Sequence, residues 1–370
     1  MSRPGPISIG PYEHQRRALK SNKDRHVVPP SREAGLGRLA MAVTIRYHCG
    51  MTPMTVVDWL LDSDPAIRWQ AMRDLVDAPG HVVASERARV ATEGWGAHIL
   101  ALQDPVRQWS DGSNSSYIQT PDGSATFALV LLRDMGLDPT SVQARSAVAL
   151  IRDKVTHYEG GRPFFAGEVE PCINGRVLAL GAYFDEPNKE VLCRLLAEQL
   201  DDGGWNCEAP KSRRSSFHTT ICVLEGLLAY ERARGADARV TEARMRGEEY
   251  LLQRRLCRSL SSGEVIDPAW TQFSFPVGWH YDVLRGLDYL RGPGVKPDDR
   301  ISEAIELVEK NRSEDGRWLL QRVHSGQIYF EMDEGLGKPS RWNTLRALRV
   351  LKWAAAEEEG GAGFSLPGAD

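Results

Sequence analysis

The chain has 370 residues, of which 42% are hydrophobic, with 46 basic and 50 acidic side chains and a net charge of −4. It is long enough to bury one large core or two smaller ones. Because the charges are balanced and interspersed, the sequence lacks the clustered basic surface of nucleic-acid-binding proteins. No apolar run reaches the roughly 18 residues that a membrane-spanning helix needs. We therefore expect neither a nucleic-acid partner nor a membrane span.

The six cysteines are loosely spaced along the chain, and no secretory signal precedes them. Small disulfide-stapled domains of secreted proteins have a much higher density of cysteines. Cysteines in apolar helical stretches behave as small buried hydrophobic residues. We expect reduced thiols and a cytoplasmic location.

Residues 1–53 differ from the rest of the chain, because they are rich in proline and basic residues and show little periodicity. This composition predicts a disordered N-terminal arm. A second interpretation is that translation begins downstream, at Met51 or Met54, so that the arm does not belong to the native protein. The folded domain is expected at 54–356, followed by a flexible tail at 357–370.

Five segments share one pattern, in which an amphipathic helix, a loop rich in Gly, Asp and Trp, and an apolar helix follow one another. The loops include residues 103–109, 160–161, 202–205, 263–279 and 315–318. The helices after them are predicted to begin near Ser124, Asn174, Thr219, Tyr281 and Asn343. Apolar residues in these helices recur at three- and four-residue steps, as Ile221, Leu224, Leu227 and Leu228 do. The pattern predicts a series of helical hairpins.

A sixth hairpin is predicted at the front of the domain, with helices at Val56–Leu61 and Ala66–Leu75. Pro65 suits the first turn of the second of these helices. Open stacks of hairpins need polar terminal caps, whereas the last helix, Trp342–Trp353, is apolar and aromatic. Strand-like alternation is almost absent. The prediction is an all-α fold, an (α/α)6 toroid in which six hairpins close into a ring around a central cavity.

The segment Gln199–Trp205, Q-L-D-D-G-G-W, resembles the Q-x-x-x-G-x-W repeat of the terpenoid cyclases and protein prenyltransferase β-subunits, which share an α/α toroid. Arg312–Trp318 matches with the Gln replaced, and Gln103–Trp109 matches with Arg107 in place of Gly. In that superfamily the repeat ties helices together on the outside of the barrel. This part of the resemblance spans residues 95–353 and concerns structure rather than catalysis.

A second resemblance involves the Gly-Gly loops and the helices that follow them. Glu170-Pro-Cys172 is similar to the D-x-C motif of prenyltransferase β-subunits, and Phe217-His218-Thr219 is similar to their aromatic-H-T motif one repeat later. In that family the Asp, Cys and His bind zinc, so the resemblance implies a zinc site at Glu170, Cys172 and His218. These are ligand types that zinc accepts. The structural alternative is that Glu170 only interacts with a helix N-terminus, where a carboxylate is favourable.

Further polar and aromatic residues are expected at the mouth of the ring. His280 occupies the position equivalent to His218 one repeat later, and we predict catalytic roles for His280, Asp282 and Glu168. Aromatic faces suit an isoprenoid chain or a carbocation, and arginines suit a diphosphate. The predicted substrate-binding residues are Trp270, Phe275, Trp279, Arg213, Arg214 and Trp342. The alternatives are that the aromatics fill the ring centre and that the arginines are solvated.

Three functions are compatible with these features. The first is a zinc-dependent prenyltransferase-like or cyclase-like enzyme acting on an isoprenoid or similar apolar substrate. The second is a metal-free cyclase or isomerase that uses Glu168, Asp267 or Asp282 as its acid, although the D-x-D-D and Asp-rich motifs of such enzymes are missing. The third is a non-catalytic binding module with a structural metal. Prenyltransferases of this family also need a separate α-subunit, so a partner subunit belongs to the first hypothesis.

Overall fold

The structure is a computed structural model. It describes residues 54–103, 109, 113–114, 125–157, 161–186, 188–324 and 330–361. The chain divides into two units, 1–52 and 53–370, and every described residue belongs to the second. The predicted arm at 1–53 and residues 362–370 of the predicted tail lie outside the described residues.

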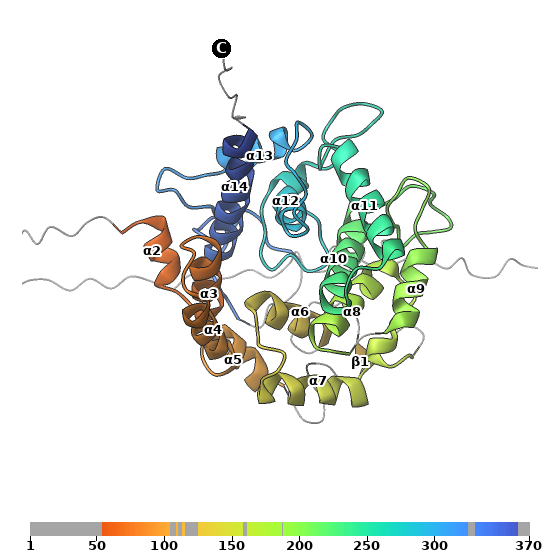
Figure 1. Cartoon of the computed structure of the whole chain (residues 1–370), viewed down its shortest axis with the longest axis horizontal. Helices are drawn as coiled ribbons and strands as arrows, with labels where there is room; N and C mark the ends of the chain where they lie inside the picture. The colour runs from red at the N-terminus through yellow and green to blue at the C-terminus, as the bar shows by residue number, and fades with distance from the viewer. Residues whose placement is uncertain are drawn as a thin grey trace, which may run out of the picture. The chain divides into compact units, whose positions relative to one another are not determined.

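The described part is built almost entirely of helices, which confirms the predicted all-α toroid (Figure 1). The inner helices are α3 (Pro65–Asp74), α6 (Ala125–Met135), α8 (Pro171–Tyr183), α10 (Phe217–Arg234), α12 (Val283–Arg291) and α14 (Arg341–Gly361). The outer helices are α2 (Val56–Leu61), α4 (Gly80–Ala88), α5 (Gly94–Ala101), α7 (Val142–Lys154), α9 (Lys189–Ala197), α11 (Ala238–Gln253) and α13 (Ser302–Lys310). Each predicted inner helix begins within a few residues of its expected position.

Short elements complete the described structure. The 3-10 helices are η1 (Arg89–Ala91), η2 (Phe164–Ala166) and η3 (Pro268–Thr271). Strands β1 (Ser113–Asn114) and β2 (Thr156–His157) form a two-residue parallel pair, with Ser113 opposite Thr156. Helix α14 continues to Gly361, five residues beyond the predicted end of the domain at residue 356.

Capping side chains explain where many of the helices begin. In the part of the chain that the structure describes, seven α-helices start at a Ser, Thr, Asp or Asn whose side-chain oxygen accepts a hydrogen bond from a backbone N–H of the first turn. These N-cap residues are Thr55, Asp64, Ser141, Asn188, Ser216, Asp237 and Asp282. Helix α8 differs, because its N-cap residue Glu170 makes no capping hydrogen bond through its side chain.

The last inner helix contacts the first, so the ring is closed. On α14, Arg341 donates to the backbone carbonyl of Asp62 at 2.8 Å. Two turns later, Arg349 donates to the side-chain oxygen of Gln70 on α3 at 3.1 Å. Helices α14 and α3 lie side by side in Figure 1. The apolar last helix therefore has a partner instead of a polar cap, as the sequence predicted.

Three buried tryptophans tie the outer helices to the loops that follow them. Each indole N–H donates to the backbone carbonyl ten residues earlier, at the end of an outer helix. The pairs are Trp109 to Ile99 at 2.9 Å, Trp205 to Leu195 at 2.7 Å and Trp318 to Val308 at 2.7 Å. The backbone N–H of Trp205 also donates to Thr220 of α10 at 3.0 Å. The repeated Trp thus connects the outer and inner layers.

Helices α8 and α10 pack backbone to backbone through two glycines. A Cβ added to Gly175 would lie 2.4 Å from the carbonyl oxygen of Cys222, and one added to Gly226 would lie 2.4 Å from the carbonyl oxygen of Gly175. No side chain fits between the helices at this point. The contact fixes the positions of their first turns, which carry Cys172 and His218.

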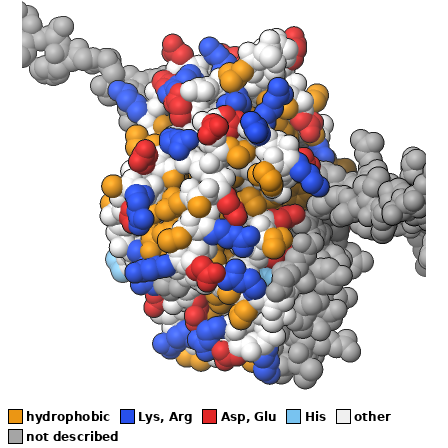
Figure 2. Space-filling model, turned by 90° about the vertical axis from the view of Figure 1, so that its right-hand side faces the viewer, with side chains coloured by type: hydrophobic (Ala, Val, Ile, Leu, Met, Phe, Trp, Pro, Cys, Tyr) orange, Lys and Arg blue, Asp and Glu red, His pale blue; other side chains and the backbone are white. Residues whose placement is uncertain are grey.

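The hydrophobic core consists of two clusters. One is built largely from α3, α6, α7 and α8, and the other from α9 to α13. Cys172 packs against both clusters. On the face shown in Figure 2, acidic, basic and hydrophobic side chains are intermixed. In the described ranges, every helix is too short or too polar to cross a membrane.

Candidate metal centre and central cavity

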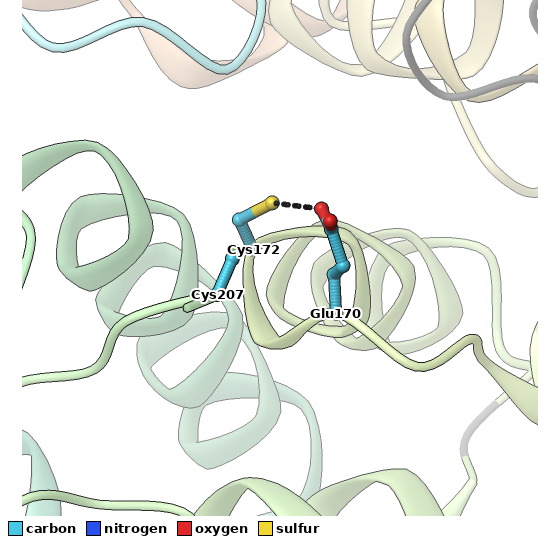
Figure 3. Close-up of side chains that lie close together, drawn as sticks. All are labelled: Glu170, Cys172 and Cys207. Carbon is cyan, nitrogen blue, oxygen red and sulfur yellow. Dashed lines mark hydrogen bonds between the residues drawn. The ribbon is translucent and has the colours of Figure 1, made fainter. Parts of the chain in front are cut away.

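Glu170, Cys172 and Cys207 form a cluster at the start of α8. One potential ligand atom from each residue lies within 4.8 Å of the other two, and all three residues are half-buried (Figure 3). Glu170 is the residue before α8, Cys172 is the second residue of that helix, and Cys207 lies in the loop before α10. Among the described residues, this is the group of three His, Cys, Asp or Glu side chains that meets this spacing.

The Glu170 side chain is directed at a thiol rather than at the helix backbone. The Cys172 Sγ–H donates to Glu170 Oε2, with 3.6 Å between the two atoms (Figure 3). This carboxylate accepts no hydrogen bond from the first-turn N–H groups of α8. The Glu170 side chain therefore does not cap α8. Its carboxylate lies close to the Cys172 sulfur instead.

Cys207 is not among the zinc ligands that the resemblance implies. In the structure it follows the anchored Trp205 by two residues, and its sulfur lies 3.3 Å from the Thr219 hydroxyl in the first turn of α10. The Cys207 backbone N–H also donates to that hydroxyl at 3.4 Å. The loop is thus held against α10 and brings its sulfur to Cys172. The signal in the sequence is a cysteine two residues after Trp205, the tryptophan that ties the loop to two helices.

The Cys172 thiol has a pKa raised well above its usual value. Its contact with Cys207 contributes most, followed by burial and by the neighbouring Cys207, Cys222 and Glu170. Without a cation, the site therefore keeps a proton on sulfur. A bound divalent metal reverses this balance, because coordinated thiols are deprotonated. Two sulfurs and one carboxylate oxygen are a donor set that zinc accepts, so the residues fit the ion that the resemblance implies.

His218 is not part of this three-residue cluster. Its Nδ1 accepts a hydrogen bond from the backbone N–H of Tyr281 at 2.8 Å, and its ring lies edge-on to Trp270 and Trp279. Burial, followed by the charge of Arg285, lowers the His218 pKa to about 4, so the ring is neutral at pH 7. The proton then resides on Nε2. Zinc binding through Nε2 requires a different hydrogen-bonding arrangement, and a metal-ligand role for His218 stays a prediction.

His280 lies in a stack of rings. Its ring centroid is 3.9 Å from that of Trp279 and 3.6 Å from that of His324, a residue that sequence reasoning missed. Burial contributes most to lowering the pKa of His280 to about 2, followed by His324 and His218. The His280 Nδ1 is buried without a hydrogen-bond partner. The ring is neutral, and its predicted catalytic role is untested.

The two predicted catalytic acids are both buried. Asp282, 2% exposed, caps α12 by accepting from the Arg285 N–H at 2.7 Å, and it also accepts from the Ser274 hydroxyl at 3.2 Å. Glu168, 1% exposed, accepts from the backbone N–H of Glu170 at 3.3 Å. Neither residue is among the described residues that line the central cavity. Their catalytic roles stay predictions, whereas the capping role of Asp282 is observed.

A cavity of about 780 Å³ lies inside the ring, lined by residues of all six inner helices. Phe275 and Trp342 contribute to its wall and stack with ring centroids 4.1 Å apart. Both were predicted to bind substrate. The other four predicted substrate-binding residues are not among the described lining residues: Trp270, Trp279, Arg213 and Arg214.

The cavity is strongly charged, in contrast to the aromatic lining that the sequence predicted. Its described wall carries four carboxylates, Asp74, Asp134, Glu225 and Asp288. Six lining arginines lie close to one of these carboxylates: Arg73, Arg133, Arg285, Arg291, Arg346 and Arg349. Three more have no carboxylate partner in the described part of the chain: Arg87, Arg176 and Arg232. Nine cations thus face four anions.

The half-buried carboxylates stay ionised because the arginines outweigh the cost of their partial burial. Arg285 holds Glu225 through two hydrogen bonds of 2.8 and 2.9 Å. Burial alone would raise the Asp288 pKa, but Arg349, Arg291 and Arg346 hold it at about 2. The same balance, dominated by Arg285, lowers the pKa of Glu225. Neither group holds a proton at neutral pH.

Helix α8 connects the cysteine cluster to the cavity. Cys172 and Arg176 are four residues apart, so they lie on the same face of the helix, about 6 Å apart along its axis. Arg176 lines the cavity, and Cys172 belongs to the cluster with Glu170 and Cys207. The candidate metal centre therefore adjoins the cavity across one helical turn.

No family model and no curated protein matches this sequence. Among solved structures, a protein from Actinoplanes is similar, with a TM-score of 0.40 and 16% identity over 79% of this chain and 90% of that one. A type II terpene cyclase from Scytonema, solved with geranylgeranyl dihydroxybenzoate, has a TM-score of 0.36 and 15% identity over 73% and 85%. Neither likeness carries a conclusion about the activity of this chain.

Proposed function

We propose that this protein is a zinc-dependent enzyme of the α/α-toroid type, related in design to prenyltransferases and terpenoid cyclases. Glu170, Cys172 and Cys207 hold the zinc. The observation that supports this is the approach of one carboxylate oxygen and two sulfurs to within 4.8 Å of one another. Three protein ligands leave one of the four usual zinc positions open, as in catalytic sites.

The proposed substrate is an isoprenoid or similar apolar molecule that enters the central cavity. The stacked rings of Phe275 and Trp342 offer it an aromatic surface. Zinc, when bound, supplies a Lewis acid and lowers the pKa of a bound thiol or water. The protein itself supplies the shielding, since Cys172 packs against both hydrophobic clusters.

A metal-free enzyme that protonates its substrate has less support. The described carboxylates of the cavity wall are all paired with arginines, and the pKa of Asp288 is held at about 2. Such groups are poor proton donors at neutral pH, because a general acid works best with a pKa near the working pH. The acids predicted for this role, Glu168, Asp267 and Asp282, are not among the lining residues that the structure describes.

The zinc content of purified variants tests the metal site. We expect about one zinc per chain in the wild type, in keeping with a single three-ligand site. Cys172→Ser and Cys207→Ser are each expected to lose most of this zinc, because serine is a poor zinc ligand. The matched control is Cys193→Ser on α9, where the thiol is exposed and outside the cluster. The measurement is elemental analysis after growth in zinc-supplemented medium.

Two results would count against the proposal. A zinc-free wild type with native helical content would remove the metal from the mechanism. If Cys172→Ser lost its fold together with its zinc, the ion would be structural, and the toroid would be better described as a binding module.

A further inference from the structure

The excess of arginines in the central cavity needs an explanation beyond the proposed zinc chemistry. The described wall has five more arginines than carboxylates. Guanidinium groups remain charged at all physiological pH values, so the excess cannot be neutralised by loss of protons. Buried charges in proteins are almost always paired. The cavity as it stands is a strongly cationic space.

Helix capping accounts for two of the three arginines that have no carboxylate partner. Arg87 donates to the Gly136 carbonyl at 2.8 Å, just beyond the end of α6. Arg232 donates to the Gly292 carbonyl at 2.5 Å, just beyond the end of α12. Cations near helix C-termini are favourable, because the last carbonyls lack partners within the helix. These two side chains therefore have a structural reason to be present.

Arg176 has no such reason. It lies in the second turn of α8, far from the C-terminal end of that helix, and is only 4% exposed. Its Nε is fully enclosed and has no hydrogen-bond partner among the described residues, and no described carboxylate forms an ion pair with its guanidinium. It nevertheless lines the cavity. An unpaired buried guanidinium is destabilising unless a ligand completes its contacts.

We propose that the cavity binds a multivalent oxyanion, such as a diphosphate, a phosphate ester or a polycarboxylate, with Arg176 as its buried contact. Guanidinium forks match the oxygen geometry of phosphates and carboxylates. Arg232, an exposed residue in the last turn of α10 that also lines the cavity, adds a second cation. A positive electrostatic potential inside a concave site raises the local concentration of anions. This site does not depend on zinc and goes beyond the proposed function.

Titration of the full-length protein with sodium pyrophosphate tests the proposal. Calorimetry at fixed ionic strength, with sodium chloride as the reference salt, is expected to show saturable binding to the wild type. Arg176→Met is expected to weaken this binding by about tenfold to a hundredfold, because a charged hydrogen-bonding partner is lost. The matched control, Arg145→Met, removes an exposed arginine from α7, outside the cavity, and is expected to leave binding unchanged.

The stability of Arg176→Met gives a second, independent readout. Without ligand, this variant is expected to unfold at a higher temperature than the wild type, because an unpaired buried charge has been removed. Adding pyrophosphate is expected to raise the unfolding temperature of the wild type more than that of the variant. Parallel titrations with phosphate and citrate identify the chemical class of the natural ligand. Tighter binding of citrate indicates a polycarboxylate, whereas tighter binding of pyrophosphate indicates a phosphate compound.

Two outcomes would overturn the oxyanion site. One is a wild type that binds neither pyrophosphate nor citrate. The other is an Arg176→Met variant that binds pyrophosphate as strongly as the control variant Arg145→Met does. The same titration on Cys172→Ser separates this proposal from the metal proposal, because anion binding is expected to survive the loss of zinc.

Discussion

Replacing Asp288 by asparagine is expected to destabilise the protein by about 3–5 kcal/mol, the usual cost of removing one partner from a buried ion pair. Asp288 accepts from Arg349 Nε at 2.7 Å and also lies close to Arg291 and Arg346. Its side chain is only 14% exposed. Without the carboxylate, these guanidiniums of α12 and α14 repel one another inside the cavity. Chemical denaturation with circular dichroism measures the loss.

The control for this prediction is Asp153→Asn on α7, which removes a carboxylate that pairs with Arg152 at 2.8 Å but is 60% exposed. Exposed ion pairs contribute about 0–1 kcal/mol, so little change is expected there. Adding Arg349→Met to Asp288→Asn is expected to recover part of the stability, because one unpaired cation is removed. A loss below about 1 kcal/mol for Asp288→Asn would show that the cavity charges are not coupled as we describe.

The same carboxylate predicts a dependence of stability on pH. Its pKa is held at about 2 in the folded protein, below the value of 3.8 for a free side chain. The resulting stabilisation is therefore fully present above about pH 4 and is lost as the pH falls towards 2. The difference in unfolding free energy between wild type and Asp288→Asn is expected to shrink over this range. A difference that stays constant between pH 5 and pH 2 would contradict the pairing.

The second large effect is expected at the contact between α8 and α10. Gly175→Ala is expected to destabilise the protein by about 3 kcal/mol or more, at the upper end of overpacking effects. The new Cβ would lie 2.4 Å from the Cys222 carbonyl oxygen, a backbone atom that cannot rotate away. The two helices must separate, which also displaces the first turns that carry Cys172 and His218. The variant is expected to lose zinc as well as stability.

Gly80→Ala on α4 is the matched control, because nothing lies within 4 Å of the position that its Cβ would occupy. This change is expected to be neutral or slightly stabilising, since alanine restricts the unfolded chain. Thermal unfolding and zinc content should be measured on both variants. If Gly175→Ala behaved like Gly80→Ala, the helices would not be in the close contact described.

Much of the fold could be predicted from the sequence, because the information is local. Pro65 marks the first turn of α3, and Val56–Leu61 is a helix with the predicted bounds. The repeated Trp recurs in one geometry at three places, since its indole always reaches the carbonyl ten residues earlier. Helices α4 and α5 were not predicted individually, because their periodicity is weak.

The candidate site was predicted only in part, because it depends on how loops cross the ring. Glu170 and Cys172 are neighbours in sequence, so their proximity was foreseeable. Cys207 was missed because its spacing from Trp205 does not show that Thr219 holds its sulfur beside Cys172. His218 begins α10 as expected, yet its Nδ1 is engaged by a backbone N–H rather than directed at a metal.

The charge of the cavity was missed for a different reason. Its arginines come from seven helices, one or two from each, so each resembles an ordinary charge on a helix surface. Arg285 and Arg346 are only 5% exposed, and they also hold a central loop through the carbonyls of Gly278, His280 and Ser274. Such side chains are recognisable as interior residues only after the helices are assembled.

X-ray absorption at the zinc edge tests the metal centre most directly. For zinc-loaded wild type, we predict two sulfur neighbours at about 2.3 Å and oxygen or nitrogen neighbours at about 2.0–2.2 Å. In Cys207→Ser, any zinc that remains bound is predicted to have one sulfur neighbour. A spectrum of the wild type with a single sulfur, unchanged in Cys207→Ser, would contradict the assignment of Cys207 and favour a site completed by His218.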